Sequence, residues 1–259
     1  MGQFQEITQH AISNASYLQI FLGIYITFGL FYFGLAFLTL RFTRDWLPKA
    51  GIGRLIDGRP LKPGQMKREM KNSLVSIGIF ALYGVLTIAL ERKEWLVIQW
   101  EFGFWDFVID LLVIALWNEL HFYACHALLH RKWLYRRIHR EHHRSAIPTP
   151  FSTFSFHWIE AVMLSSVMIL LMPFRHLNIG VILFFPVASL IYNNIGHMNY
   201  AVFPQHRLGS FFSSCRRHTM HHTRIRGNYG FVLPWFDFLF KTRARNVDYD
   251  APLEDLPEA

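Results

Sequence analysis

Histidines in the middle of this chain have the spacing of metal ligands on helices. The stretch from His126 to His143, HALLHRKWLYRRIHREHH, holds five of them as H-x3-H and H-x2-HH, and a second H-x2-HH follows at 218–222. Side chains three and four positions apart share one helical face, so each motif can direct two or three imidazoles to one point. Imidazole binds Fe, Zn, Cu and Ni, so the pattern predicts a transition-metal site without selecting the ion.

The directions of these histidines require a bend between the first two motifs. At about 100° per residue, His126 and His130 point in nearly the same direction, whereas His139 lies roughly 180° from His130. If both motifs serve one site, the chain turns within residues 131–135, although no Gly or Pro marks the place. The alternative is one straight basic helix with solvated histidines, and the double occurrence of H-x2-HH argues against it.

The composition is that of a membrane protein. The 259 residues are 52% hydrophobic with a mean hydropathy of +0.20, which is too apolar for an ordinary soluble domain of this size. The formal net charge of +8 comes from basic residues beside apolar runs, as at an anionic membrane surface, so we expect no nucleic-acid partner. Cys125 and Cys215 are too few for a disulfide framework.

Several apolar segments are candidates for membrane crossings. Residues 17–40 carry no charge and exceed the roughly 20 residues that a bilayer core requires, and 73–90 are just long enough. Residues 104–129 form a third apolar run that leads directly into the first histidine motif. Residues 159–172 and 177–192 are short for full crossings, so a hairpin that enters and returns is as plausible as two complete spans.

The distribution of Lys and Arg predicts the orientation in the membrane. Residues 41–71 carry nine of them, whereas the connector after the second segment carries only Arg92 and Lys93. The positive-inside rule then places the N-terminus outside and every histidine motif in the cytoplasm. We therefore predict an all-α, multi-pass bundle of about four to five membrane helices with a cytoplasmic histidine-rich di-metal cap. Its expected parts are membrane helices with a basic loop (1–104), a catalytic domain (105–245) and a polar tail (246–259).

Two stretches resemble the fatty acid hydroxylase and sterol desaturase superfamily. The first, FYACHALLHRKWLYRRIHREHHRSAIPTPFSTFSFHWIEA from Phe122, contains two histidine boxes, and its PTPFS segment with Phe156 and His157 is most similar to the sterol C5-desaturase branch. The second, HTMHHTRIRGNYGFVLPWFDFLFKT, resembles the last box with its Asn-Tyr-Gly and Trp-x-Asp-x-Leu-Phe patterns. In NNIGHMNY, Asn193 and His197 stand where some relatives have two histidines.

The resemblance implies a non-haem di-iron centre in a cage of histidines, with Zn as an alternative metal in the isolated protein. The ligands it implies are His126, His130, His139, His142, His143, His157, His197, His218, His221 and His222. All of these except His157 and His197 are the expected catalytic residues. Glu119, Glu160 and Asp237 are candidates for orienting imidazole N–H groups. The alternatives are a core role beside Trp158 for His157, a helix-end role for His197, and a packing role for His121.

The resemblance also implies an enzyme of lipid biosynthesis that hydroxylates or desaturates a sterol or fatty-acyl lipid with O2 as co-substrate. The chain has no G-x-G-x-x-G and no C-x-x-C-H motif, so electrons must come from a separate cytochrome b5-like or ferredoxin-like donor. The alternatives are a zinc-dependent membrane hydrolase and a non-catalytic metal carrier. A carrier is disfavoured because the histidine motifs lie at or beyond the ends of the apolar segments.

Overall fold

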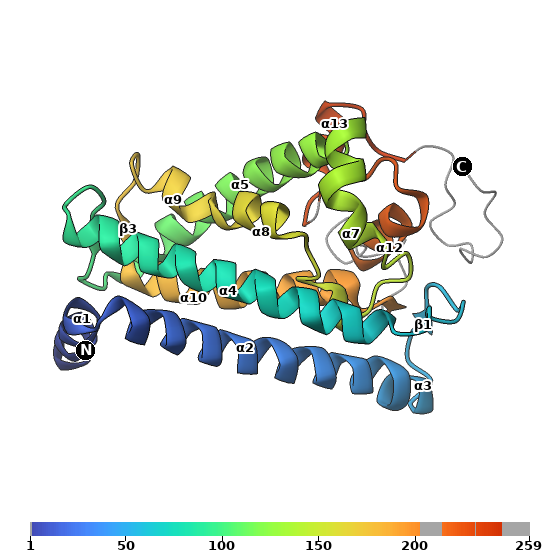
Figure 1. Ribbon diagram of the computed structural model, residues 1–259, viewed down its shortest axis with the longest axis horizontal. Helices are drawn as coiled ribbons and strands as arrows, with labels where there is room; N and C mark the ends of the chain where they lie inside the picture. The colour runs from blue at the N-terminus through green and yellow to red at the C-terminus, as the bar shows by residue number, and fades with distance from the viewer. Residues whose placement is uncertain (1, 203–213, 231, 245–259) are drawn as a thin grey trace.

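Four long helices form the body of the protein, lying along its longest dimension (Figure 1). The computed structural model describes residues 2–202, 214–230 and 232–244. Within these residues, the helices that are long and apolar enough to cross a bilayer are α2 (Tyr17–Arg41), α4 (Gln65–Arg92), α5 (Phe104–Leu129) and α10 (Ile179–His197). The predicted all-α, multi-pass bundle is thereby confirmed.

The helices differ from the predicted segments mainly at their ends. A π-helical turn, η1 (Phe42–Trp46), and α3 (Leu47–Lys49) extend α2, so that the apolar rod runs from Tyr17 to Lys49. The predicted segment at 159–172 is two short helices, α8 (Trp158–Ser165) and α9 (Val167–Leu171), which are together too short to be counted as a span. Of the two short segments, only α10 has the length of a crossing.

Small elements occupy the two ends of the bundle. At one end lie α1 (Gly2–Asn14) and a parallel pair formed by β2 (Ile98–Gln99) and β3 (Leu177–Asn178) (Figure 1). The other end holds an antiparallel pair, β1 (Arg54–Leu55) with β4 (Tyr200–Ala201), and a group of short helices. That group comprises α6 (Lys132–Leu134), η2 (Tyr135–His139), α7 (Arg140–His143), η3 (Pro150–Ser152), α12 (Ser214–Arg224) and α13 (Trp235–Leu239).

Side-chain caps begin two of the long helices. Ser16 and Gln19 form a capping box at the start of α2, in which each side chain accepts a hydrogen bond from the other residue's backbone N–H. The Asn178 side chain accepts from the backbone N–H of Gly180 at 2.8 Å and begins α10. These bonds satisfy N–H groups that have no partner inside the helix.

The predicted bend between the first two histidine motifs is confirmed at Arg131. Helix α5 ends at Leu129, and Arg131 takes an extended conformation with ψ of 135° before α6 begins. The chain thus changes direction without Gly or Pro, since one extended residue suffices to separate two helices. The bend places the second histidine motif over the end of α5.

An apolar core below the histidines joins the long helices. Four buried side chains from different elements pack together here. They are Tyr32 of α2, Ile77 of α4, Phe154 of the segment before α8, and Leu190 of α10. The Tyr32 hydroxyl lies 2.7 Å from Ser73 Oγ and donates to the Phe151 carbonyl at 2.6 Å. The helices are therefore linked by directional bonds as well as by apolar contact.

At the opposite end, a buried carboxylate ties three elements together. Asp110 of α5 accepts hydrogen bonds from Arg175 Nε and from the backbone N–H of Asn178, each at 2.8 Å, and it is fully buried. A buried acceptor that loses its charge weakens every bond made to it. This site fixes the connection between α5 and α10.

We expect Asp110→Asn to lower the free energy of unfolding by about 1–3 kcal/mol, because the neutral amide presents N–H groups to other donors. Thermal or denaturant unfolding in detergent micelles measures the change. Asp45→Asn is the matched control, since Asp45 pairs with Arg41 at the surface and such pairs contribute about 0–1 kcal/mol. Equal stability of the two variants would contradict the role of Asp110.

Candidate metal centre

Nine imidazoles gather in two groups at the end of the bundle where α5 and α10 terminate. The first cluster consists of His126, His130, His139, His143 and His221. The second cluster consists of His142, His197, His218 and His222. Within each cluster, the candidate ligand atoms all lie within 4.8 Å of one another. Four chain segments supply them, namely the ends of α5 and α10, the η2–α7 helix and α12.

The ring nitrogens of the first cluster face one another at close range. His143 Nε2 lies 3.1 Å from His139 Nε2 and 3.1 Å from His221 Nε2, and His221 Nε2 lies 3.1 Å from His130 Nε2. Two nitrogens bound at right angles to a metal at about 2.1 Å lie about 3 Å apart. The observed separations therefore match the edges of a metal coordination shell.

The second cluster repeats this arrangement. His218 Nε2 lies 3.0 Å from both His197 Nε2 and His222 Nε2. The His142 ring is packed against that of His222, with a centroid separation of 4.6 Å. The His142 ring also lies 5.6 Å, centroid to centroid, from that of His139 in the first cluster, so the two clusters are adjacent.

The other ring nitrogen of most of these histidines is held by an oxygen acceptor. In the first cluster, the Nδ1–H groups of His126 and His221 donate to the carbonyls of Tyr229 and Gly227, each at 2.7 Å. His139 Nδ1 donates to Glu160 Oε1 at 2.8 Å. Because a carbonyl oxygen only accepts, the His126 and His221 rings carry their proton on Nδ1 and their lone pair on Nε2. The Nε2 lone pairs are therefore directed into the cluster.

In the second cluster, three backbone carbonyls hold three rings. His142 donates to Ser155 at 3.3 Å, His197 to Asn193 at 2.8 Å and His222 to Ser145 at 3.0 Å. The lone pairs of His197 and His222 both face His218 Nε2, which can donate only one proton. Hydrogen bonding alone therefore cannot satisfy the Nε2 atoms of His197, His218 and His222, whereas one cation between them can bind all three. The donor set thus fits one metal ion in each cluster.

The surroundings keep the imidazoles neutral. Burial, followed by repulsion from neighbouring imidazoles, lowers the pKa of each cluster histidine that lies outside the membrane-spanning helices. These are His130, His139, His142, His143, His218, His221 and His222. A neutral ring retains the lone pair that a metal needs. At neutral pH the site therefore presents uncharged nitrogen ligands.

Gly227 has a conformation that other residues rarely adopt. Its φ is 76°, and a Cβ at this position would lie 2.9 Å from the Thr242 carbonyl oxygen. The adjacent Asn228 N–H donates to that same carbonyl at 2.9 Å. The tight turn brings the Gly227 carbonyl to His221 Nδ1, so the glycine supports the metal site through its backbone.

The three predicted acidic residues have different roles. Glu160 is buried and bonds directly to His139, as expected for a carboxylate that orients a metal-binding ring. Asp237 accepts from the N–H groups of Tyr229 and Gly230 at 2.8 Å each, so it acts on His126 through the Tyr229 carbonyl. Glu119 accepts from the Leu233 N–H at 3.0 Å and contacts no cluster imidazole in the bonds described.

The structure does not bring His157 into either cluster. Its Nδ1 accepts from the Ile159 N–H at 3.2 Å, and its ring stacks on Trp158, so it caps the start of α8. Asn193 donates to Ser189 on the same helix, and only its backbone carbonyl contacts a cluster histidine. His121 lies 3.1 Å from Ser166 Oγ, also outside the clusters.

The carbonyl partners were missed by sequence reasoning. Ser145, Ser155, Asn193 and Tyr229 each hold an imidazole through a backbone oxygen that every residue possesses. Side-chain type therefore carries no signal for this role. The turn at Gly227 is the exception, because the GNYG sequence marks a tight turn there.

A small cavity of about 10 Å³ adjoins both clusters. This volume is about that needed to hold one water molecule. Its wall includes His126 and His139 of the first cluster and His142, His197 and His218 of the second. The remaining lining residues are mostly apolar, namely Phe122, Leu129, Phe156 and Leu164, with Glu160 and Asn193. A molecule the size of water in this cavity is therefore in reach of both clusters.

Comparison with known proteins places this region in a family. The profile of the fatty acid hydroxylase family matches residues 111–242. The chain is 26% identical over 180 residues to Delta(7)-sterol 5(6)-desaturase ERG3B of Gibberella zeae, covering 67% of this chain and 54% of that protein. It is 25% identical over 181 residues to human lathosterol oxidase, covering 64% and 57% of the two chains. Protein CER1-like 1 of Arabidopsis thaliana is 30% identical over 149 residues, which are 52% of this chain and 24% of that protein.

These matches confirm the predicted resemblance to the superfamily and to sterol desaturases. The chain spans about half the length of the two sterol enzymes and about a quarter of the third relative. No solved structure matches the chain.

We expect Glu160→Ala to weaken metal binding at the first cluster by about 10- to 100-fold, because the His139 ring loses the acceptor that orients it. Titration of metal-stripped protein with Co²⁺, followed by visible absorption, measures the Co²⁺ affinity of each cluster. Glu160→Gln is the matched control, since an amide oxygen can still accept from His139 Nδ1 and the loss should be smaller. Unchanged affinity in Glu160→Ala would show that this bond does not support a metal site.

Proposed function

The chain belongs to the fatty acid hydroxylase family, and we propose that it is a membrane-bound di-iron oxidoreductase that hydroxylates or desaturates a lipid. The observation that carries the proposal is the pair of adjacent imidazole clusters that share one cavity. All nine clustered histidines are proposed as metal ligands. Two bound iron ions would supply O2 activation and oxidation of an unactivated C–H bond, with O2 as co-substrate.

The protein's own contribution is placement and exclusion of water. The buried carbonyls and Glu160 hold the imidazoles in fixed orientations, so the site needs little rearrangement before it acts. Phe122, Phe156 and Leu164 give the cavity an apolar wall beside the histidines. Such a wall limits the access of water to the histidines.

The proposed substrate is a sterol or fatty-acyl lipid of a biosynthetic pathway. The names of the sterol relatives and the family match support a lipid. The cavity wall is built partly by α5 and α10, which are long enough to span the bilayer. The cavity histidines of these two helices therefore lie near the ends of helices that a membrane lipid can contact.

We also propose that the histidine end of the bundle faces the cytoplasm. This end is where α2 finishes and α4 begins, and the connecting segment belongs to the basic stretch at 41–71 with nine Lys or Arg. Positive residues are retained on the cytoplasmic side of membrane proteins. The histidines and the basic segment lie at one end, which supports the orientation.

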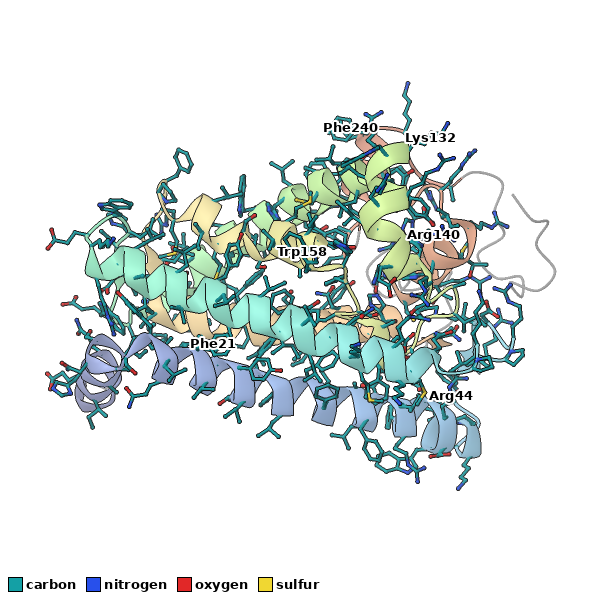
Figure 2. The ribbon with its side chains drawn as sticks, viewed as in Figure 1. Phe21, Arg44, Lys132, Arg140, Trp158 and Phe240 are labelled. Carbon is teal, nitrogen blue, oxygen red and sulfur yellow. The ribbon has the colours of Figure 1, made fainter. Side chains whose placement is uncertain are left out.

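A separate cytochrome b5-like or ferredoxin-like protein is the proposed source of electrons. Residues 131–140 form an exposed basic ridge over the first cluster, made up of Arg131, Lys132, Arg136, Arg137 and Arg140. Figure 2 labels Lys132 and Arg140 on this ridge, and Lys132 is directed away from the bundle. Tyr135, on the same segment, lies 5.5 Å from the His130 ring and 5.6 Å from the His143 ring. An acidic partner on the ridge would thus be close to the metal ligands.

Metal content and O2 uptake test the proposed activity. Purified wild type should contain about two iron ions per chain and consume O2 only when a reductant is added, with stimulation by a lipid extract. The His142→Ala, His221→Ala double variant removes one ligand from each cluster and should lose both properties. His157→Ala is the control and should retain them, because that ring lies outside the clusters.

Two other results would overturn this proposal. Stoichiometric zinc after growth with abundant iron, with no O2 uptake from any donor, would favour a zinc-dependent hydrolase or a metal carrier. Full turnover with no added reductant would exclude the separate electron donor.

Reversing charge on the basic ridge tests the donor site. With a protein donor, the Arg136→Glu, Arg137→Glu variant should show roughly a tenfold lower rate at low salt, because electrostatic attraction accelerates association by 10-fold or more. With a small chemical reductant its rate should match wild type. Lys67→Glu is the control for an exposed cation on α4. Equal rates with the protein donor at low and high salt would contradict docking on the ridge.

A further inference from the structure

We propose that Glu69 of α4 is a positioning residue of the metal centre and that it acts selectively on the second cluster. The inference deepens the proposed function, since it concerns the same metal site. Glu69 is fully buried, and it lies in α4, outside the residues matched by the family profile. Its partners lie on the segment that follows the second histidine motif.

Glu69 holds two hydroxyls of that segment. Its Oε1 accepts from Ser145 Oγ at 2.7 Å, and its Oε2 accepts from Thr149 Oγ1 at 2.5 Å. Gln65, one turn earlier, donates to Glu69 Oε1 and to the Ile147 carbonyl, each at 2.8 Å. The carboxylate is thus the centre of a network that fixes residues 145–149 against α4.

Ser145 transmits this restraint to a cluster histidine. Its hydroxyl also accepts from Arg68 Nη2 at 3.0 Å, so the side chain is held from two directions. Its backbone carbonyl accepts from His222 Nδ1 at 3.0 Å. Two consecutive hydrogen bonds therefore connect Glu69 to the ring of His222.

The same helical face reaches a second imidazole of this cluster. Asn72, three residues after Glu69, donates to Ser155 Oγ at 3.3 Å and to Glu141 Oε1 at 2.9 Å. The Ser155 carbonyl accepts from His142 Nδ1 at 3.3 Å. One face of α4 thereby supports both ends of the 145–155 segment, and each end orients one histidine of the second cluster.

The ring-nitrogen acceptors of the first cluster lie outside this network. The described Nδ1 acceptors of this cluster are Tyr229, Gly227 and Glu160, which lie in other parts of the chain. Loss of the Glu69 contacts should therefore disturb one metal site and leave the other intact. A residue that merely stabilises the fold would affect both sites together.

The test is the Co²⁺ titration of metal-stripped Glu69→Gln. We expect about a tenfold lower Co²⁺ affinity at the second cluster and an unchanged affinity at the first. Changing a residue that orients a metal ligand lowers metal affinity by about 10- to 100-fold. The absorption that is lost should be the band missing in His218→Ala, and not the band missing in His126→Ala. Asp110→Asn is the matched control because it makes the same chemical change at a buried carboxylate at the other end of the bundle.

Two results would overturn the inference, namely wild-type affinity at both sites in Glu69→Gln, or equal weakening of both. If Glu69→Gln fails to fold by circular dichroism, Ser145→Ala decides the matter. That variant keeps the carbonyl bound to His222 but removes the hydroxyl held by Glu69, and retention of wild-type affinity would refute the proposal. A wild type that binds two Co²⁺ ions but consumes no O2 with iron contradicts the proposed function and leaves this inference intact.

Discussion

The structure depends on packing nine neutral imidazoles close together, eight of them buried, and on holding most of their outer ring nitrogens with oxygen acceptors. In each ring, one nitrogen is available for a metal, and an acceptor on the other nitrogen offsets the cost of burying it. Backbone carbonyls supply most of these acceptors, at Ser145, Ser155, Asn193, Gly227 and Tyr229. The chain must therefore turn beside the cluster wherever a carbonyl is needed. The irregular segments around the histidines follow from this requirement.

A membrane bundle is a suitable support for such a site. Its long helices are held by apolar cores and by buried polar ties at both ends, such as Tyr32 with Phe151 and Asp110 with Arg175. The helices α5 and α10 each contribute cluster histidines at their ends. The same two helices also line the small cavity beside the histidines.

Helix α4 is part of the site as well as of the membrane bundle. Polar residues of α4 contact the segment that carries the carbonyls of Ser145 and Ser155. A catalytic region defined by residues 105–245 would omit these contacts, although the division of the chain into domains remains a prediction. Physical support for a metal centre can extend beyond the part of the chain that carries its ligands.

Much of this organisation follows from the sequence. The 3.6-residue helical period of the histidine motifs predicted the metal site and the bend at residues 131–135, because two motifs roughly 180° apart cannot serve one site on a straight helix. The apolar runs predicted the long helices, since their length and lack of charge are properties of local sequence. The resemblance named all nine clustered histidines. It also included His157, which the structure places as a helix cap.

The tertiary structure alone decided how the histidines divide between two clusters and what holds each ring. His142 and His143 are adjacent in sequence, yet they belong to different clusters because neighbouring residues on a helix point about 100° apart. The orienting carbonyls carry no sequence signal, because every residue has one. Glu69 could not be assigned either, since its partners Ser145 and Thr149 are far away along the chain. Local spacing predicts which residues can act together, whereas contacts between distant segments exist only in the folded chain.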